Sequence, residues 1–370
     1  MKVIIAAAGT AGHINPGLSI ANKIKEEEPN SEIIFIGTQR GLENNLVPRA
    51  GYGLKTIDAY GLNFKRPDRL LKTLKGFGKA KKIIKEFKPD VVIGTGGYIC
   101  GAVISQASRL RIPTLLHESN AFPGKAVKML AKRTDCIMVG FNEAKERLKN
   151  AKRIVVTGNP TKIKDLNYSK DEKEKIIKGL GLDTSKPILL VFGGSQGARA
   201  INNAIIKIVK AKMNKNYQII WAPGPIQYDI IKEELKNSSM DIEKLENVKV
   251  FPYIYNMEEI MNISDLLICR SGAMTVNEVS IVGKPAIFIP LPGVSQNHQE
   301  YNAKVLENIG AAKIVNNEDL EIIDLNKYVE ELIYEQELLK QMGEKAKTVA
   351  QYDVLETIYK EIKQTILHKC

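Results

Sequence analysis

Short apolar runs alternate with longer amphipathic stretches along the first part of the chain. Uncharged runs of Val, Ile and Ala are typical of strands buried on both faces, and the amphipathic stretches between them predict helices. Strands that are separated by helices indicate parallel βαβ units rather than hairpins. The predicted strands are Lys2–Ala8, Glu32–Gly37, Asp90–Gly94, Pro113–His117, Cys136–Val139 and Ile154–Thr157, and the clearest helices are Pro16–Glu27 and Arg69–Phe87.

The same alternation starts again after an interruption. The sequence Gly158-Asn159-Pro160 ends the first series, and a stretch rich in Lys and Asp follows it to Ser185. Because 370 residues exceed one ordinary core, we expect an α/β protein with domains at 1–159 and 160–347. A helix at about 348–370, within the helical pattern Leu338–Lys369, is expected to pack back on the first domain. The strands of the second series are Ile188–Phe192, Gln218–Ala222, Val248–Phe251, Leu266–Cys269 and Ala286–Pro290.

Glycine-rich turns follow several of these strands, at 9–13, 94–98 and 193–199. In parallel sheets such turns meet at the carboxyl ends of the strands, where α/β proteins bind ligands. The stretch Leu266–Glu278 also predicts a strand, a small-residue turn and a helix start, whose N–H groups favour an anion. It is either an ordinary strand–helix junction or a phosphate site, in which Glu278 would accept hydrogen bonds from sugar hydroxyls.

Three polar segments carry candidate chemistry. His13 lies at the start of a helix, which favours its neutral form and suits a proton acceptor, although a lone histidine is more often structural. The segment His117–Ala121 is either a solvated loop or a loop that faces a ligand. The amides of Gln296–Ala303 follow a predicted strand, and amides can both donate to and accept from sugar hydroxyls.

Charge narrows the choice of partners. The chain has 44% apolar and 26% charged residues and a formal net charge of +12, which favours an anionic partner or surface. The region 61–90 has ten Lys or Arg against three acids, with leucines and Phe77 at helical spacing. It is either a core stripe with a solvated charged face or a helix that binds an anionic membrane. Nucleic acid is less favoured, because no binding module is present.

Targeting and metal signals are weak. The apolar opening, Met1–Ala8, is too short to span a bilayer, and it predicts a first strand rather than a signal peptide. The four cysteines have neither metal nor disulfide spacing, so we expect a cytoplasmic protein without a bound metal.

Six motifs occur in order along the chain: G-T-A-G-H-I-N-P, G-T-G-G-Y, H-E-S-N-A, G-G-S-Q-G-A-R, R-S-G-A-M-T-V-N-E and H-Q-E-Y-N-A. Taken together they resemble the MurG glycosyltransferases over nearly the whole chain. The resemblance implies a GT-B architecture, in which two Rossmann-like domains with parallel sheets face a central cleft. It also implies inverting transfer of N-acetylglucosamine from UDP-N-acetylglucosamine to the C4 hydroxyl of undecaprenyl-pyrophosphoryl-muramyl-pentapeptide, without a cofactor, at the cytoplasmic membrane face.

The resemblance also implies roles for individual residues. His13 would be the general base, Glu278 would bind the ribose, and the Ile254 backbone would bind the uracil. Ser195 would hold the diphosphate and Gln299 the sugar hydroxyls. The remaining substrate-binding residues would be Thr10, Ala11, Gly12, Asn120, Lys162, Ala273, Met274 and Thr275.

Three positions depart from the family pattern. Ala11 replaces a common glycine, Lys162 stands where some relatives have arginine, and His298 stands where some have glutamine. The rival hypotheses are a GT-B transferase with another sugar or acceptor, a GT-B epimerase, and a non-catalytic basic membrane or RNA adaptor. Only the adaptor would have no use for three glycine turns together with Glu278 and Gln299.

Overall fold

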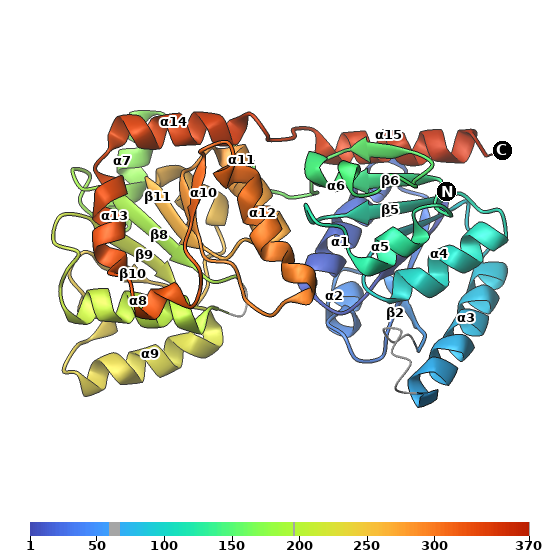
Figure 1. Ribbon diagram of the computed structural model, residues 1–370, viewed down its shortest axis with the longest axis horizontal. Helices are drawn as coiled ribbons and strands as arrows, with labels where there is room; N and C mark the ends of the chain where they lie inside the picture. Colours follow the sequence, from blue (N-terminus) through green and yellow to red (C-terminus); the bar gives the residue numbers. More distant parts are fainter. Residues whose placement is uncertain (59–66, 195–196, 370) are drawn as a thin grey trace. The chain divides into compact units, whose positions relative to one another are not determined.

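The computed structural model describes residues 1–58, 67–194 and 197–369. The chain divides into an N-terminal unit, Met1–Thr161 with Gln351–Cys370, and a C-terminal unit, Lys162–Ala350. Each unit contains one parallel β-sheet flanked by helices, which confirms the predicted α/β class (Figure 1). In the part of the chain described, no helix is both long and apolar enough to cross a bilayer.

The N-terminal sheet has seven strands in the order β3-β2-β1-β4-β5-β6-β7, and all neighbours are parallel. The strands are β1 (Lys2–Ala7), β2 (Glu32–Gly37), β3 (Gly53–Thr56), β4 (Val91–Gly96), β5 (Thr114–Glu118), β6 (Cys136–Val139) and β7 (Ile154–Val156). The helices are α1 (Ala11–Glu27), α2 (Glu43–Arg49), α3 (Pro67–Phe87), α4 (Ile99–Arg109), α5 (Lys125–Leu130), α6 (Asn142–Glu146) and α15 (Val354–Leu367).

The central strand β1 supplies both faces of this sheet, because successive side chains of a strand point in opposite directions. Val3 and Ile5 are buried in a core with residues of α1 and α15. Ile4 and Ala6 are buried in a second core with residues of α3 and α4. The apolar run predicted as a strand is therefore covered by helices on both sides.

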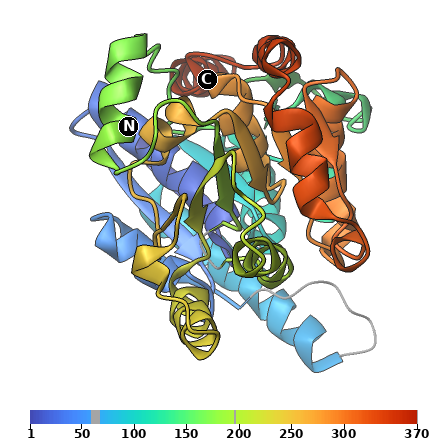
Figure 2. The ribbon, with the colours of Figure 1, turned by 90° about the vertical axis from the view of Figure 1, so that its left-hand side faces the viewer.

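The C-terminal sheet has six parallel strands in the order β10-β9-β8-β11-β12-β13. Residues of α8 and α13 cover one face, and α9 packs against α8 (Figure 2). The strands are β8 (Ile188–Phe192), β9 (Gln218–Ala222), β10 (Val248–Val250), β11 (Leu266–Cys269), β12 (Ala286–Phe288) and β13 (Ala312–Ile314). The helices are α7 (Lys170–Gly179), α8 (Arg199–Lys210), α9 (Pro225–Asn237), α10 (Met257–Ile263), α11 (Ala273–Val282), α12 (His298–Glu307), α13 (Leu325–Ile333) and α14 (Gln336–Lys347), with 3-10 turns η1 (Ile242–Lys244), η2 (Ser295–Asn297) and η3 (Asp319–Glu321).

Strand order reverses once in each sheet, between β1 and β4 and between β8 and β11. In open parallel sheets, ligands bind beside the carboxyl ends of the strands at such a reversal. The glycine turns that follow β1, β4 and β8, and the turn that follows β11, therefore lie where the topology places a ligand.

The structure corrects three predictions. The edge strands β3 and β13 were not predicted, because both are short and partly exposed and neither forms an apolar run. Helix α1 begins at Ala11 rather than Pro16, since Ile14 is already part of the buried helical stripe. The single helical pattern Leu338–Lys369 is two helices, α14 and α15, with Asp353 in a left-handed conformation before α15.

Candidate active site

The turn between β1 and α1 holds His13 at a helix start. Gly9 adopts a φ of +97°, and Thr10 is the N-cap of α1. Thr10 and Gly12 are exposed, whereas Ala11 is half-buried. The Thr10 carbonyl accepts from the N–H groups of His13 (3.0 Å) and Ile14 (3.2 Å), which closes the first turn.

The imidazole of His13 is held in one tautomer. Its Nδ1 lies 3.1 Å from the carbonyl oxygen of Ala8, and a carbonyl can only accept, so Nδ1 carries the hydrogen. Nε2 of the neutral ring then keeps its lone pair and can accept a proton. His13 is half-buried, and this hydrogen bond leaves Nε2 able to accept a proton.

The second glycine turn packs directly against the first. A side chain at Gly96 would overlap the ring of His13, and a Cβ at Gly97 would come within 2.8 Å of the Ala8 carbonyl oxygen. Gly96 and Gly97 also have φ values of +131° and +82°, which favour glycine. Thr95 Oγ1 donates to the carbonyl of His13 at 2.8 Å. The two turns that were predicted separately thus form one structure around the histidine.

Glu43 is a positioning residue that the sequence analysis missed. Its buried carboxylate accepts from the N–H of Gly9 (3.0 Å), the N–H of Thr38 (2.8 Å) and the hydroxyl of Thr38 (2.6 Å). Burial acts to raise the pKa of Glu43, but the hydrogen bonds from Thr38 and Gly9 outweigh it, so the pKa lies below its usual range. Glu43 therefore joins the end of β2 to the turn that carries His13.

The loop after β5 is ordered by Glu118. One carboxylate oxygen accepts from the backbone N–H (2.9 Å) and the side-chain amide (3.0 Å) of Asn120, and the other from the N–H of Gly124 (2.8 Å). His117 is fully buried and its Nε2 donates to the Gly158 carbonyl at 3.0 Å. Burial lowers the pKa of His117 to about 4, so this histidine is neutral and structural at pH 7.

In the C-terminal unit, the turn from β11 into α11 presents a helix N-terminus. Gly272 is the N-cap, and the first bond closing the helix runs from the N–H of Val276 to the Gly272 carbonyl at 3.0 Å. The N–H groups of Ala273, Met274 and Thr275 precede that bond and point along the helix axis toward the carboxyl ends of the strands. The first turn contains no acidic residue, so its positive end is not neutralised from within.

Buried Arg270 fixes this turn to the neighbouring strand. Its guanidinium donates to the carbonyls of Ile289 (2.9 Å) and Pro290 (3.1 Å) and to Oδ1 of Asn317 (2.8 Å). Desolvation lowers the pKa of Arg270, but an arginine remains charged at pH 7. The sequence analysis did not single out Arg270, because its partners are distant in sequence.

Gln299 lies beside the same turn. The hydroxyl of Ser271 donates to its backbone carbonyl at 2.8 Å, and the N–H of Leu291 donates to its Oε1 at 2.9 Å. Two consecutive non-glycine residues before α12, Gln296 and Asn297, have φ values of +59° and +49°. Such backbone costs on the order of 1 to 3 kcal/mol per residue and clusters at ligand-binding sites.

The remaining predicted residues are placed as follows. Glu278 is half-buried on α11. Burial and then the charge of the Glu278 carboxylate raise the pKa of the Cys269 thiol, so this carboxylate lies near the end of β11. Ile254 is buried in the loop after β10, whereas Lys162 is exposed at the start of the C-terminal unit. Ser195 lies outside the described residues. No group of three or more His, Cys, Asp or Glu residues that could hold a metal ion occurs among the residues with assigned structure.

Comparison with known proteins covers most of the chain. The glycosyltransferase family 28 N-terminal domain matches residues 3–139, and the C-terminal domain of the same family matches residues 188–358. Among solved structures, MurG of Acinetobacter baumannii has a TM-score of 0.79 and 28% identity, covering 98% of this chain and 99% of that one. A UDP-GlcNAc 2-epimerase from Neisseria meningitidis, solved with UDP-GlcNAc, shares the fold at 15% identity and a TM-score of 0.64 over the full length of both chains.

Curated relatives are closer. A protein of Acetivibrio thermocellus is 42% identical over all of this chain and 99% of its own length. A protein of Thermoanaerobacter sp. is also 42% identical, over 98% of this chain and 99% of its own. Both are named UDP-N-acetylglucosamine–N-acetylmuramyl-(pentapeptide) pyrophosphoryl-undecaprenol N-acetylglucosamine transferase. The chain therefore belongs to the MurG family of glycosyltransferases, with the GT-B fold of that family.

Proposed function

We propose that this protein transfers N-acetylglucosamine from UDP-N-acetylglucosamine to the C4 hydroxyl of undecaprenyl-pyrophosphoryl-N-acetylmuramyl-pentapeptide, with inversion at the sugar carbon. This reaction converts lipid I to lipid II in peptidoglycan synthesis. Full-length identity of 42% to relatives that are named for this transfer supports the proposal. The N-terminal unit is assigned the lipid acceptor and the C-terminal unit the nucleotide sugar.

The observation that carries the proposal is the contact of His13 Nδ1 with the carbonyl oxygen of Ala8. With Nδ1 bonded to the Ala8 carbonyl, Nε2 takes the proton of the C4 hydroxyl while that oxygen attacks the anomeric carbon of the donor. The C–O bond to UDP breaks as the new bond forms, which inverts the anomeric configuration. A positioned base of this kind contributes roughly 10² to 10⁴ in rate. Thr10, Ala11, Gly12 and Asn120 are assigned contacts to the donor.

The departing UDP carries negative charge that must be stabilised as its bond to the sugar breaks. The N–H groups of Ala273, Met274 and Thr275 and the positive end of α11 are suited to a diphosphate. Glu278 is assigned to the ribose hydroxyls, and Gln299 to the hydroxyls of the transferred sugar. The Ile254 backbone is assigned to the uracil. Ser195 and Lys162 complete the assigned donor contacts, and no step is assigned to a metal.

We assign the protein to the cytoplasmic face of the cell membrane as a peripheral protein. Helix α3 supports this: Ala80 and Ile84 are buried in the core, while its lysines from Lys75 to Lys85 face solvent. This cationic face suits an anionic lipid surface, each cation contributing about 1 kcal/mol. Leu70, Leu71 and Leu74, also expected in the apolar stripe, have side chains outside the described part of the structure.

UDP release from UDP-N-acetylglucosamine, with and without the muramyl-pentapeptide lipid, tests the proposed reaction. We expect release only when the lipid is present, together with a disaccharide lipid product detected by mass spectrometry. Donor consumption without lipid would favour the epimerase alternative. Release with a diacylglycerol acceptor, or transfer of another sugar, would assign the protein to a different GT-B transferase.

A further inference from the structure

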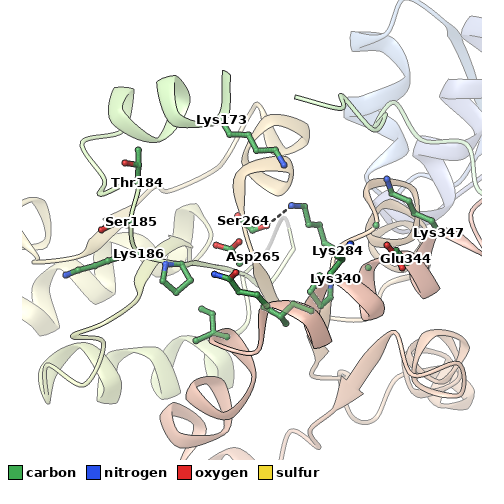
Figure 3. A pocket seen from close by; sticks show the side chains of 17 residues that line it. Lys173, Thr184, Ser185, Lys186, Ser264, Asp265, Lys284, Lys340, Glu344 and Lys347 are labelled. Carbon is green, nitrogen blue, oxygen red and sulfur yellow. Dashed lines mark hydrogen bonds between the residues drawn. The ribbon is translucent and has the colours of Figure 1, made fainter. Parts of the chain in front are cut away.

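A pocket of the C-terminal unit lies at the opposite end of the sheet from the turns described above. Pro187, Asp265 and Pro285 directly precede strands β8, β11 and β12, and all three line the pocket. One face of α14 and Lys173 of α7 complete its wall (Figure 3). Its volume is about 590 Å³, which lies within the roughly 300 to 1,000 Å³ of small-molecule sites.

The pocket wall carries an excess of positive charge. Five lysines line it against two carboxylates, those of Asp265 and Glu344, which gives a formal charge of +3. The side-chain ammonium groups of Lys173 and Lys340 make neither a hydrogen bond nor an ion pair with any residue that the structure describes. The five lysines are Lys173, Lys186, Lys284, Lys340 and Lys347.

Lys284 is paired with backbone carbonyls rather than with an acid. Its ammonium donates to the carbonyls of Asn262 (2.8 Å) and Ser264 (2.7 Å), the second of which is drawn in Figure 3. An ammonium has three N–H bonds, so one donor remains for a ligand. Burial and then the nearby charge of Lys173 lower the pKa of Lys284 to about 8.

The nearby acids are already engaged. Asp265 accepts from the N–H of Ile188 at 2.7 Å, and Asp165 forms an ion pair with Lys347 at 2.5 Å. Figure 3 draws Lys173 reaching from α7 toward the end of Lys284, and the two charges are close enough to interact. Lys173 and Lys284 repel each other, and the carboxylates of Asp265 and Asp165 offset this repulsion only in part, so a bound anion would reduce it further.

The floor of the pocket is apolar and rigid. Ile333 and Leu339 are buried and face it together with Pro187. Helix α14 approaches the end of α11 so closely that a Cβ at Gly343 would overlap the carbonyl oxygen of Gly283. An anionic group at the lysines and an apolar group at this floor would both find matching surfaces.

We propose that this pocket binds a small phosphorylated molecule, with its phosphate at Lys173 and Lys284 and its apolar part against Leu339. The site is separate from the nucleotide-sugar site, and the proposal does not depend on the transferase activity. Phosphate is favoured over carboxylate because it carries more negative charge and more acceptor oxygens, which suits a pocket wall with a formal charge of +3.

Calorimetric titration of the full chain with inorganic pyrophosphate at pH 7 tests the site. Saturating UDP is present throughout, so that the proposed donor site is filled. We expect the wild type to bind pyrophosphate at one remaining site. Binding should be at least about tenfold weaker in Lys284→Gln and in the double variant Lys173→Gln with Lys340→Gln. A lost hydrogen bond from a charged group costs about 1.4 kcal/mol or more, which corresponds to this factor. The matched control replaces two exposed lysines on other helices, Lys207 and Lys236, by glutamine.

Proton uptake gives an independent readout. At pH 8.5 free Lys284 is partly neutral, and a bound phosphate favours its charged form, so binding should take up protons from the buffer. The charged groups facing Lys284 are Lys173, Asp165, Asp265 and Lys347, with Glu344 on the α14 wall. Uptake should disappear in Lys284→Gln and persist in the lysine control.

Absence of binding once UDP is saturating, or equal binding in all variants, would overturn the proposal. If Lys284→Gln does not fold, the double variant decides.

Discussion

Replacing Glu43 by glutamine tests whether the turn that carries His13 is held from β2. The carboxylate accepts three hydrogen bonds, two on Oε1 from Thr38 and one on Oε2 from Gly9. A glutamine oxygen can keep the bonds from Thr38, but its amide nitrogen would then face the N–H of Gly9. One buried hydrogen bond to a charged acceptor is lost and two donors oppose each other, so we expect the N-terminal unit to lose about 2 to 3 kcal/mol of stability.

The catalytic effect should separate turnover from donor binding. The displaced turn carries His13, whereas the nucleotide contacts are assigned largely to the C-terminal unit. A base displaced by about 1 Å costs up to about a hundredfold in rate. We therefore expect kcat of Glu43→Gln to fall by about ten- to a hundredfold, with the KM for UDP-N-acetylglucosamine changed less than about twofold.

Stability must be measured in each unit separately. The only tryptophan of the chain, Trp221, is buried in β9, so its fluorescence reports on the C-terminal unit and should not change. Hydrogen exchange of the peptides that cover β1 and α1 reports on the N-terminal unit and should become faster. The control is Glu26→Gln, which changes an exposed acid on α1. Equal behaviour of the two variants, or a higher donor KM with unchanged kcat, would refute the reasoning.

The pH dependence of this stability follows from the lowered pKa of Glu43. A carboxyl whose pKa is lower in the folded state stabilises the fold above its unfolded pKa of about 4.3. The contribution is lost as the pH falls through the lower folded value. The free energy of opening, obtained from exchange rates corrected for their intrinsic pH dependence, should differ between the wild type and Glu43→Gln by a constant amount from pH 6 to 8, and this difference should narrow below about pH 4. A difference that widens on acidification would contradict this sign.

Four further changes test the proposed roles. His13→Ala should lower kcat by about 10² to 10⁴ with little effect on UDP affinity measured by calorimetry; a pure loss of affinity would exclude it as the base. Gly96→Ala puts a methyl group into the His13 ring and should lower kcat in the lipid-dependent assay, whereas Gly101→Ala, which has open space around it, should not. Glu278→Gln should raise the donor KM by about tenfold, from a lost charge-assisted hydrogen bond, with kcat nearly unchanged; the reverse pattern would reject the ribose assignment. Changing four exposed α3 lysines to glutamine should weaken binding to phosphatidylglycerol vesicles by about a hundredfold or more, and unchanged binding would mean that this face is only solvated; the lysines are Lys75, Lys79, Lys82 and Lys85.

The sequence was informative where one segment determines its own structure. The apolar run at Lys2–Ala8 predicted β1 because a strand buried on both faces needs no polar positions. Short β13 carries an exposed Lys313 and pairs on one side only, so it gave no such signal. The six motifs together identified the family, which full-length relatives confirm.

The site was less predictable, because its geometry depends on contacts between residues that are distant in sequence. His13 was singled out, but nothing local indicated that its ring lies on Gly96. Glu43 and Arg270 are buried charges that depend on such contacts too: Glu43 accepts from the N–H of Gly9 in another loop, and Arg270 donates to the carbonyl of Ile289. An acid or an arginine in a single sequence does not reveal whether it will face solvent or a backbone N–H or carbonyl across the sheet. The catalytic and donor-binding roles themselves stay predictions.

Helix α15 has a consequence for how the chain is synthesised. It packs beside α1 through Ile358 and Ile362 and through ion pairs such as Lys363–Glu28 (2.7 Å), yet it follows the entire C-terminal unit in the sequence. The ribosome adds about 5 to 20 residues per second, so about 10 to 40 seconds separate the seventh strand from this helix. During that interval the C-terminal unit can fold from contiguous sequence, while the face of the N-terminal sheet beneath α15 stays uncovered. That face is therefore where a nascent chain is most exposed to aggregation and to chaperone binding.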